Sequence, residues 1–304
     1  MKNKTVFISG TNSGFGKVAV ERFTQEGWQV AATVRNKADH PGLFDEFPTV
    51  KLYSLDTSNN AQVEEVAKAV IADFKRIDVV INNAGYCLMG PTETTSMEQI
   101  VHQYETNIFG VFAVTKSFIS HFRQHGGGTF INLSSSSGLF NYPFIAAYGS
   151  SKWAVRGLSE ALGIELAPFN IQVKVIYPGT HATKIFTKLE QGAAADNPAY
   201  QPYRQYYKTF LLAQTKLPAT VPVNVVEEMI KAANNPRGPI NIIAGGDAKF
   251  LDRMKKLLPE RVFQKLQLRI MKSPMTKPEI GFFTRLFGRR VAKMEMNIEP
   301  DLIK

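Results

Sequence analysis

Tyr148 and Lys152, in the stretch AAYGSSKWA (146–154), are the residues whose possible chemistry is easiest to name. They are four residues apart, so on a helix both side chains lie on one face, one turn apart. A phenol can donate a proton to the alkoxide that forms when a carbonyl is reduced, but its ordinary pKa near ~10 is poorly matched to neutral pH. A neighbouring ammonium favours the phenolate and lowers that pKa. The pair fits general acid–base catalysis, although a surface tyrosine beside a solvated lysine gives the same spacing by chance.

A glycine-rich stretch, SGTNSGFGK (9–17), follows the apolar run TVFIS near the start of the chain. Gly10, Gly14 and Gly16 allow a tight turn and a close approach of the backbone to a pyrophosphate. A helix that begins at this loop directs its first N–H groups at such an anion. The spacing is G-x-x-x-G-x-G, which differs from the standard G-x-G-x-x-G, but its place between a strand and a helix predicts a dinucleotide site.

These candidate residues must be positioned by the elements around them. Short runs rich in Val, Ile, Phe or Tyr alternate with amphipathic segments, and nearly continuous apolar runs are typical of strands buried on both faces of a parallel sheet. In the segment after residue 60, apolar residues recur at helical spacing, and TTSMEQ (94–99) offers two overlapping capping boxes, Thr95 with Glu98 and Ser96 with Gln99. The pattern predicts an α/β fold with a doubly wound parallel sheet, in which ligands bind at the carboxyl ends of the strands. The predicted strands are residues 5–9, 28–34, 50–55, 78–82, 129–133, 171–177 and 240–244.

Taken together, the glycine loop, the NNAG run at 82–85, the Tyr/Lys pair and the PGTHAT run at 178–183 resemble the classical short-chain dehydrogenases/reductases. Within that family the chain looks most like the branch of steroid and retinol dehydrogenases and carbonyl reductases, over roughly residues 3–183. The resemblance implies a Rossmann-like catalytic domain over 1–246, with 184–222 as a substrate lid. A basic helical extension over 247–304 is expected to pack on or near the same domain.

The resemblance also implies a complete catalytic set. A serine 13 residues before the tyrosine is Ser135, within INLSSSSG, and its hydroxyl is expected to bond the substrate carbonyl oxygen. A shift of one residue would give that role to Ser134 or Ser136 instead. Asn107, in YETNIFG, is expected to hold a water that links Lys152 to a proton relay.

The end of the second predicted strand indicates which nicotinamide cofactor the chain binds. An acidic residue there would accept from the adenosine ribose hydroxyls and repel a 2′-phosphate, but this chain has Arg35, a fork donor suited to phosphate. With Ser13, and with Lys17 or Lys37 assisting, it predicts NADP(H), unless Arg35 is only a surface arginine. The expected cofactor-binding residues are Gly10, Asn12, Ser13, Gly14, Phe15, Gly16, Arg35, Asp56, Thr57, Asn83, Ala84, Gly85, Tyr148, Lys152, Pro178, Gly179 and Thr183.

The expected reaction is the NADPH-dependent reduction of an apolar ketone or aldehyde, because aromatic residues crowd the predicted lid and the mouth of the site. Two alternatives stay open, a non-enzymatic NADP(H) sensor and a peripheral membrane-associated protein that reuses the fold. A sensor has no need of Asn107, Ser135, Tyr148 and Lys152 together. The aromatic and sulfur-containing side chains expected near the substrate are Tyr86, Met89, Tyr142, Phe144, Tyr200, Tyr203, Tyr206, Tyr207 and Phe210.

Net charge and composition limit the kinds of partner that the protein is expected to bind. The chain has 304 residues and a formal net charge of +10, and residues 249–293 hold 13 Lys or Arg against 3 Asp or Glu, so the basic excess belongs to this segment. Such a run suits weak contact with a membrane surface or a solvated helical face, and no nucleic-acid partner is expected. Family resemblance implies a homodimer or homotetramer.

The number and spacing of the cysteines and histidines limit the disulfide and metal chemistry expected of the chain. A single cysteine, Cys87, excludes an intramolecular disulfide and suits a reducing compartment, and it is expected to be a small packing residue. The five histidines, His181 among them, show no metal-ligand spacing, so no metal is expected. No run approaches the ~20 apolar residues of a membrane span, and no secretory signal is recognised, so the protein is expected in the cytoplasm.

Overall fold

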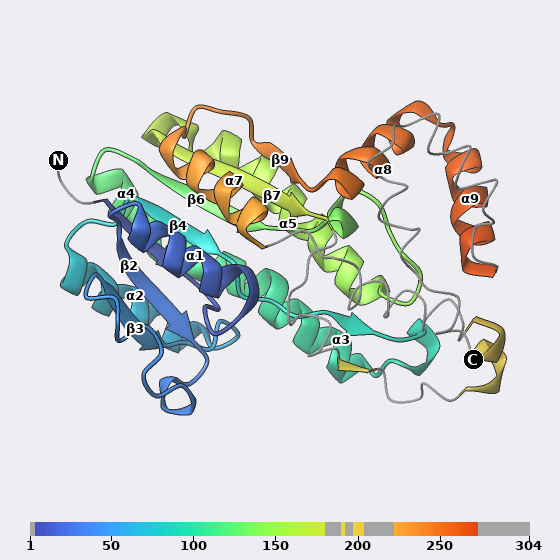
Figure 1. The fold of residues 1–304 in the computed structure, drawn as a ribbon, viewed down its shortest axis with the longest axis horizontal. Helices are drawn as coiled ribbons and strands as arrows, with labels where there is room; N and C mark the ends of the chain where they lie inside the picture. Colours follow the sequence, from blue (N-terminus) through green and yellow to red (C-terminus); the bar gives the residue numbers. More distant parts are fainter. Residues whose placement is uncertain (1–3, 180–189, 192–196, 204–221, 273–304) are drawn as a thin grey trace.

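Seven parallel strands form one sheet in the computed structural model, which describes residues 4–179, 190–191, 197–203 and 222–272 (Figure 1). The strand order is β3-β2-β1-β4-β6-β7-β9, and every neighbouring pair is parallel. All seven predicted strands are present. They are β1 (Thr5–Ile8), β2 (Gln29–Val34), β3 (Val50–Ser54), β4 (Val79–Asn82), β6 (Gly128–Leu133), β7 (Ile171–Pro178) and β9 (Asn241–Ala244).

The order of the strands creates a switch point beside β1. From β1 the chain moves outward through β2 and β3, then crosses back so that β4 pairs with the other side of β1. The remaining strands continue outward in that second direction. A crevice opens at the carboxyl ends of the strands where the direction reverses, and this is where doubly wound sheets bind ligands.

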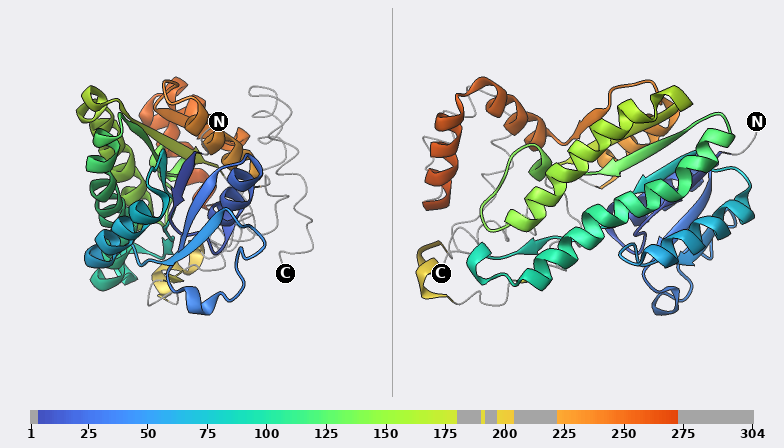
Figure 2. Two further views of the ribbon diagram at one scale, coloured as in Figure 1. Left: turned by 90° about the vertical axis from the view of Figure 1, so that its left-hand side faces the viewer. Right: turned by 180° about the vertical axis from the view of Figure 1, so that it is seen from behind.

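Helices cover both faces of the sheet, as two views show (Figure 2). Helices α1 (Gly14–Gln25) and α7 (Val223–Asn234) share one buried cluster with side chains such as Val6 and Ile8. Helices α2 (Asn60–Phe74), α4 (Gly110–Gln124) and α5 (Ala146–Glu165) pack on the opposite face around Phe7 and Phe130. Successive residues of β1 therefore point into different layers, and both faces of the sheet are buried as its apolar runs predicted.

Local capping decides where several helices begin. Asn59 caps α2 by accepting from the backbone N–H of Gln62, as the polar start of that segment suggests. Ser96 and Gln99 form the predicted capping box at the start of α3 (Met97–Tyr104). The alternative box with Thr95 does not form, because the Thr95 hydroxyl donates to the carbonyl oxygen of Pro91 in the preceding turn, η2 (Thr92–Thr94).

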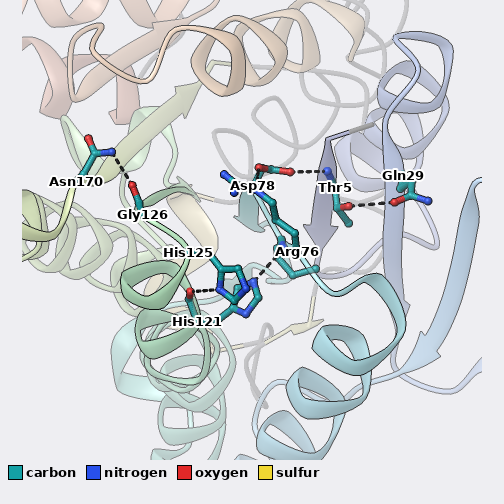
Figure 3. Close-up of polar contacts among 9 residues, drawn as sticks. Thr5, Gln29, Arg76, Asp78, His121, His125, Gly126 and Asn170 are labelled. Atoms are coloured by element: carbon teal, nitrogen blue, oxygen red, sulfur yellow. Dashed lines mark hydrogen bonds and ion pairs between the residues drawn. The ribbon is translucent and has the colours of Figure 1, made fainter. Parts of the chain in front are cut away.

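The amino edge of the sheet is closed by polar contacts between loops and helix ends (Figure 3). The carboxylate of Asp78 accepts from the backbone N–H of Thr5 at 2.9 Å. Nε2 of His121 accepts from the backbone N–H of Ile77 at 3.0 Å, and burial lowers the pKa of His121 to about 4, which keeps the ring a neutral acceptor. These loops are tied to the sheet, and the large cleft of the protein lies at the other edge.

Two helices follow the last strand, as predicted for residues 247–271. Helices α8 (Gly246–Leu257) and α9 (Glu260–Lys272) extend beyond β9 at the carboxyl side of the sheet (Figure 1). Met254 and Phe263 are buried against Tyr177, and the ammonium of Lys255 donates to the carbonyl oxygen of Leu139 at 2.6 Å. Among the described residues, no helix is both long and apolar enough to cross a membrane.

Candidate active site

A cleft of about 760 Å³ opens at the carboxyl edge of the sheet. Its lining comes from the loops that follow β1, β2, β3, β4, β6 and β7, and from the first turns of α5. Most of the predicted site residues meet there. Those that line the cleft are Gly10, Asn12, Ser13, Gly14, Phe15, Arg35, Asp56, Thr57, Asn83, Ala84, Gly85, Ser135, Tyr148, Lys152, Pro178 and Gly179.

The glycine loop is packed against the NNAG segment. Nδ2 of Asn83 donates to the carbonyl oxygens of Ser9 and Gly10, both at 2.8 Å, while the Ser9 hydroxyl accepts from the backbone N–H groups of Asn83 and Ala84. Gly16 lies behind this turn, where a Cβ would overlap the carbonyl oxygen of Gly10. A side chain at residue 16 would therefore push α1 away from the loop.

The start of α1 suits an anion. Its first turn holds no acidic residue, and the N-cap Ser13 makes no side-chain capping bond in the part of the chain that the structure describes. The first N–H groups of the helix thus stay directed at the cleft, where the helix dipole favours negative charge. Together with the close backbone packing of the loop, this geometry fits the pyrophosphate of a dinucleotide.

The end of the cleft next to β2 and β3, where the adenosine of a dinucleotide is expected and which is called the adenosine end below, carries both signs of charge. Arg35 is 71% exposed, and its Nε lies 3.8 Å from Oδ2 of Asp56. Burial works against ionisation of Asp56, but hydrogen bonds from Ser58 and the charge of Arg35 hold the pKa of that carboxyl below its usual range. The sequence prediction missed three residues that line this end, Asn36, Asp39 and His40, since the segment that holds them follows no motif.

Tyr148 and Lys152 lie one turn apart on α5, as their spacing predicted, and both are almost fully buried, at 8% and 5% exposure. Nζ of Lys152 donates to the carbonyl oxygen of Leu133 at 2.9 Å and lies 5.7 Å from the centre of the Tyr148 ring. Burial lowers the pKa of Lys152 to about 8. It raises the pKa of Tyr148, although a hydrogen bond from the Ser135 side chain acts in the opposite direction. The expectation that the neighbouring ammonium lowers the Tyr148 pKa is not met here, because desolvation dominates.

The four consecutive serines have different surroundings. Ser134 is buried, and its hydroxyl donates to the carbonyl oxygen of Lys152 at 2.9 Å. Ser136 and Ser137 are buried in the short turn η4 (Ser136–Gly138). Ser135 alone of the four is half-exposed, its hydroxyl accepts from the backbone N–H of Ser137 at 3.1 Å, and it lines the cleft together with Tyr148. The serine that the family spacing selects, Ser135, is thus the one of the four that is not buried, and its role stays a prediction.

Close packing requires a glycine at position 138, directly after the four serines. A Cβ on Gly138 would overlap the Ser134 hydroxyl and lie 2.8 Å from the carbonyl oxygen of Lys152. Only glycine lets this turn approach α5 so closely. The turn after β6 therefore packs closely against α5, the helix that carries Tyr148.

Asn107 does not line the cleft; it lies buried behind it. The residue is in a π-helical turn, η3 (Glu105–Phe109), between α3 and α4, a kind of turn often found at functional sites. Its Oδ1 accepts from the backbone N–H of Tyr86 at 3.2 Å, and its Nδ2 donates to the Tyr86 carbonyl oxygen and to the Ser151 hydroxyl, both at 3.1 Å. Asn107 thus joins the NNAG segment to the helix of Tyr148.

Gln103 was missed by the sequence prediction and has a related role. Its fully buried amide accepts from the backbone N–H of Leu88 at 2.7 Å and donates to the carbonyl oxygen of Tyr86 at 2.9 Å. The one signal in the sequence was its position, one turn before Asn107 on the same helix. Both amides hold the wall of the cleft in place.

Behind the cleft, Tyr148 belongs to a buried apolar cluster with Cys87, Met89 and Ile145. Cys87 is buried, and burial raises the pKa of its thiol to about 12, which confirms it as a packing residue. Among the residues that the structure describes, no cluster of side chains could hold a metal ion. Thr183, His181 and most of the predicted lid (184–222) lie outside the described residues.

Comparisons with known proteins agree with this geometry. The sequence model of the family described as short chain dehydrogenase matches residues 4–194. The uncharacterized oxidoreductase YusZ of Bacillus subtilis (strain 168) is 36% identical over 219 residues, which cover 69% of this chain and 77% of that protein. Retinol dehydrogenase 8 of Homo sapiens is 30% identical over 251 residues, which cover 78% of this chain and 80% of that protein.

The fold has relatives among solved structures as well. A short-chain dehydrogenase from Streptomyces avermitilis superposes with a TM-score of 0.75 and 27% identity, and the match covers 88% of this chain and 98% of that one. The family match spans more than half of the chain and includes the glycine loop and the Tyr148–Lys152 helix. The protein therefore belongs to the short-chain dehydrogenases, a family of oxidoreductases that bind nicotinamide cofactors.

Proposed function

We propose that the protein is an NADPH-dependent carbonyl reductase that converts an apolar ketone or aldehyde to the alcohol. One observation carries this proposal: Ser135, Tyr148 and Lys152 converge in the cleft whose other end holds the phosphate loop. A protein that only sensed the cofactor would have no need of a buried acid at this place. The arrangement supports a reaction in which a proton and a hydride reach one carbonyl group.

In this proposal the bound nicotinamide supplies the hydride, and the chain supplies the rest. Tyr148 donates its phenolic proton to the carbonyl oxygen, and its raised pKa keeps it protonated at neutral pH. The Ser135 hydroxyl bonds the same oxygen and stabilises the charge that develops on it. That hydroxyl is already oriented by the backbone N–H of Ser137.

Lys152 and Asn107 support the proton transfer from behind. A Cβ built on Gly85 would lie 3.0 Å from Oδ1 of Asn107 and 3.6 Å from Nζ of Lys152, so both polar atoms approach the same point. A water between them could pass a proton from solvent to the buried pair. This placement supports the expected proton relay. Asn107 would then have a second role besides its hydrogen bonds to the backbone of Tyr86.

The substrate is proposed to be apolar because the side chains that pack around Tyr148 are apolar. Cys87, Met89 and Ile145 are buried against the tyrosine, with Tyr142 partly buried beside them. None of these side chains carries a charge, so an ionic substrate would lose its hydration without a partner. Similarity to retinol dehydrogenase 8 supports a lipid-like carbonyl compound.

Replacing Tyr148 with phenylalanine tests the proposed acid. Tyr148→Phe keeps the ring that packs on Cys87 and Ile145 but removes the proton donor. NADPH-dependent reduction of a ketone should fall by about 10²-fold or more, while the dissociation constant of NADPH changes little. A ketone panel followed by NADPH absorbance, with NADPH binding measured by fluorescence, checks both outcomes; turnover retained in this variant would contradict the proposal.

Separate alanine substitutions at 134, 135 and 136 test which serine bonds the substrate. Ser135→Ala should lower kcat/KM by about 10²-fold, because a donor to the developing oxyanion is lost. Ser136→Ala serves as the matched control and should stay near wild type in kcat/KM. Ser134→Ala should mainly lower the melting temperature, since its hydroxyl bonds the α5 backbone. The largest loss of turnover at 134 or 136 would show that the register is wrong.

Arg35 tests the cofactor preference. Arg35→Ala should raise the KM for NADPH about tenfold and leave the KM for NADH nearly unchanged, because a charge-assisted bond to the 2′-phosphate is removed. Arg123→Ala, an exposed arginine at the far end of α4, is the matched control. Steady-state kinetics with NADPH and NADH measures this effect. A wild-type enzyme that prefers NADH would refute the proposed NADP(H) preference.

A further inference from the structure

His40 occupies the adenosine end of the cleft, although no motif includes it. Residues 35–39 after β2 are exposed, but His40 is half-buried because the chain folds back through a short turn, η1 (Lys37–Asp39). Its backbone N–H donates to the carbonyl oxygen of Lys37 at 3.1 Å. The imidazole lines the cleft together with Arg35 and Asn36.

The imidazole of His40 also contacts the phosphate loop. Its Nε2 lies 3.4 Å from Nδ2 of Asn12, which directly precedes Ser13 in the phosphate loop. A neutral ring accepts from the Asn12 amide at this nitrogen. A protonated ring donates there, so the amide of Asn12 must then present its oxygen. The protonation of His40 and the orientation of Asn12 are therefore linked.

The charges around His40 are balanced. Asp39 is tied to Asn36 at 3.0 Å, and Asp56 is paired with Arg35. Residues 10–16 of the phosphate loop carry no charge. Arg35 and Lys37 together match the charges of Asp39 and Asp56, so a proton on the imidazole makes this end of the cleft net positive. The charged and titratable groups on the neighbouring elements are Arg35, Lys37, Asp39, Asp56 and, from α3, His102.

We propose that protonated His40 is a second cation for the adenosine 2′-phosphate, beside Arg35, with Asn12 orienting its ring. Only the protonated ring carries a positive charge, so affinity for a 2′-phosphorylated cofactor is expected to be higher at low pH. An imidazolium N–H to phosphate is a charge-assisted hydrogen bond, which is among the stronger ones. The inference rests on the NADP(H) preference proposed above and adds a pH-dependent part to it.

Calorimetric titration tests this directly without any turnover. Adenosine 2′,5′-bisphosphate and AMP, which differ by the 2′-phosphate, are titrated into wild type, His40→Gln, His40→Lys and a control, His125→Gln. His125 lies at the opposite edge of the sheet (Figure 3). Comparing variants at one pH removes the titration of the phosphate itself, since that is common to all of them.

The expected result is that His40→Gln weakens binding of the bisphosphate but not of AMP. His40→Gln should bind the bisphosphate about tenfold more weakly at pH 6, and within about twofold of wild type at pH 8. AMP binding should stay unchanged, which also shows that the variant is folded. His40→Lys, with a permanent charge, should bind the bisphosphate tightly at both pH values, and His125→Gln should match wild type.

Two results would overturn the inference about His40. Only the second of them would also contradict the proposed NADP(H) preference. If His40→Gln binds the bisphosphate like wild type at pH 6 while Arg35→Ala binds it weakly, His40 has no part in the subsite and the cofactor preference stands. If wild type binds AMP and the bisphosphate equally at both pH values, the NADP(H) preference fails and the role of His40 fails with it.

Discussion

The site depends on the close packing of the turn after β6 against α5. Ser134 bonds the backbone of Lys152, and Gly138 leaves room for that contact. Deeper in the sheet, Asn132 donates to Ser159 on the same helix at 2.8 Å and accepts from Asn82 of β4. Buried polar networks of this kind specify one arrangement, because every member that loses its partner is costly. They position Ser135, on the turn, in the same cleft as Tyr148, on the helix.

The two ends of the cleft differ in their electrostatics. At the Tyr148 end, burial raises the pKa of the phenol and lowers that of the Lys152 ammonium, so both groups respond strongly to any charge that a ligand brings. At the adenosine end, Arg35 is exposed and paired with Asp56 at a distance that water can screen. In the proposed function, chemistry therefore takes place in the buried part of the cleft and cofactor selection in the exposed part.

Much of this was predictable from local sequence. The strands were found because buried parallel strands read as apolar runs, and the Tyr148–Lys152 pair because helical spacing is regular. Ser135 was selected by a family spacing, and it is the one of the four serines that is not buried. What the sequence could not give depends on contacts between distant segments: the π-helical turn that holds Asn107, the buried amide of Gln103, and the return of His40 to the phosphate loop. The direction of the Tyr148 pKa shift was also out of reach, since burial is a property of the folded chain.

The central claim is that a hydride and the proton of Tyr148 reach one carbonyl group in this cleft. It is tested most directly with NADPH that carries deuterium at both C4 positions, an apolar ketone and mass analysis of the alcohol formed. The account predicts one deuterium on the carbinol carbon in wild type and about 10²-fold less alcohol, or lower still, with Tyr148→Phe. Alcohol without deuterium, or NADPH consumed with no alcohol formed, would contradict it.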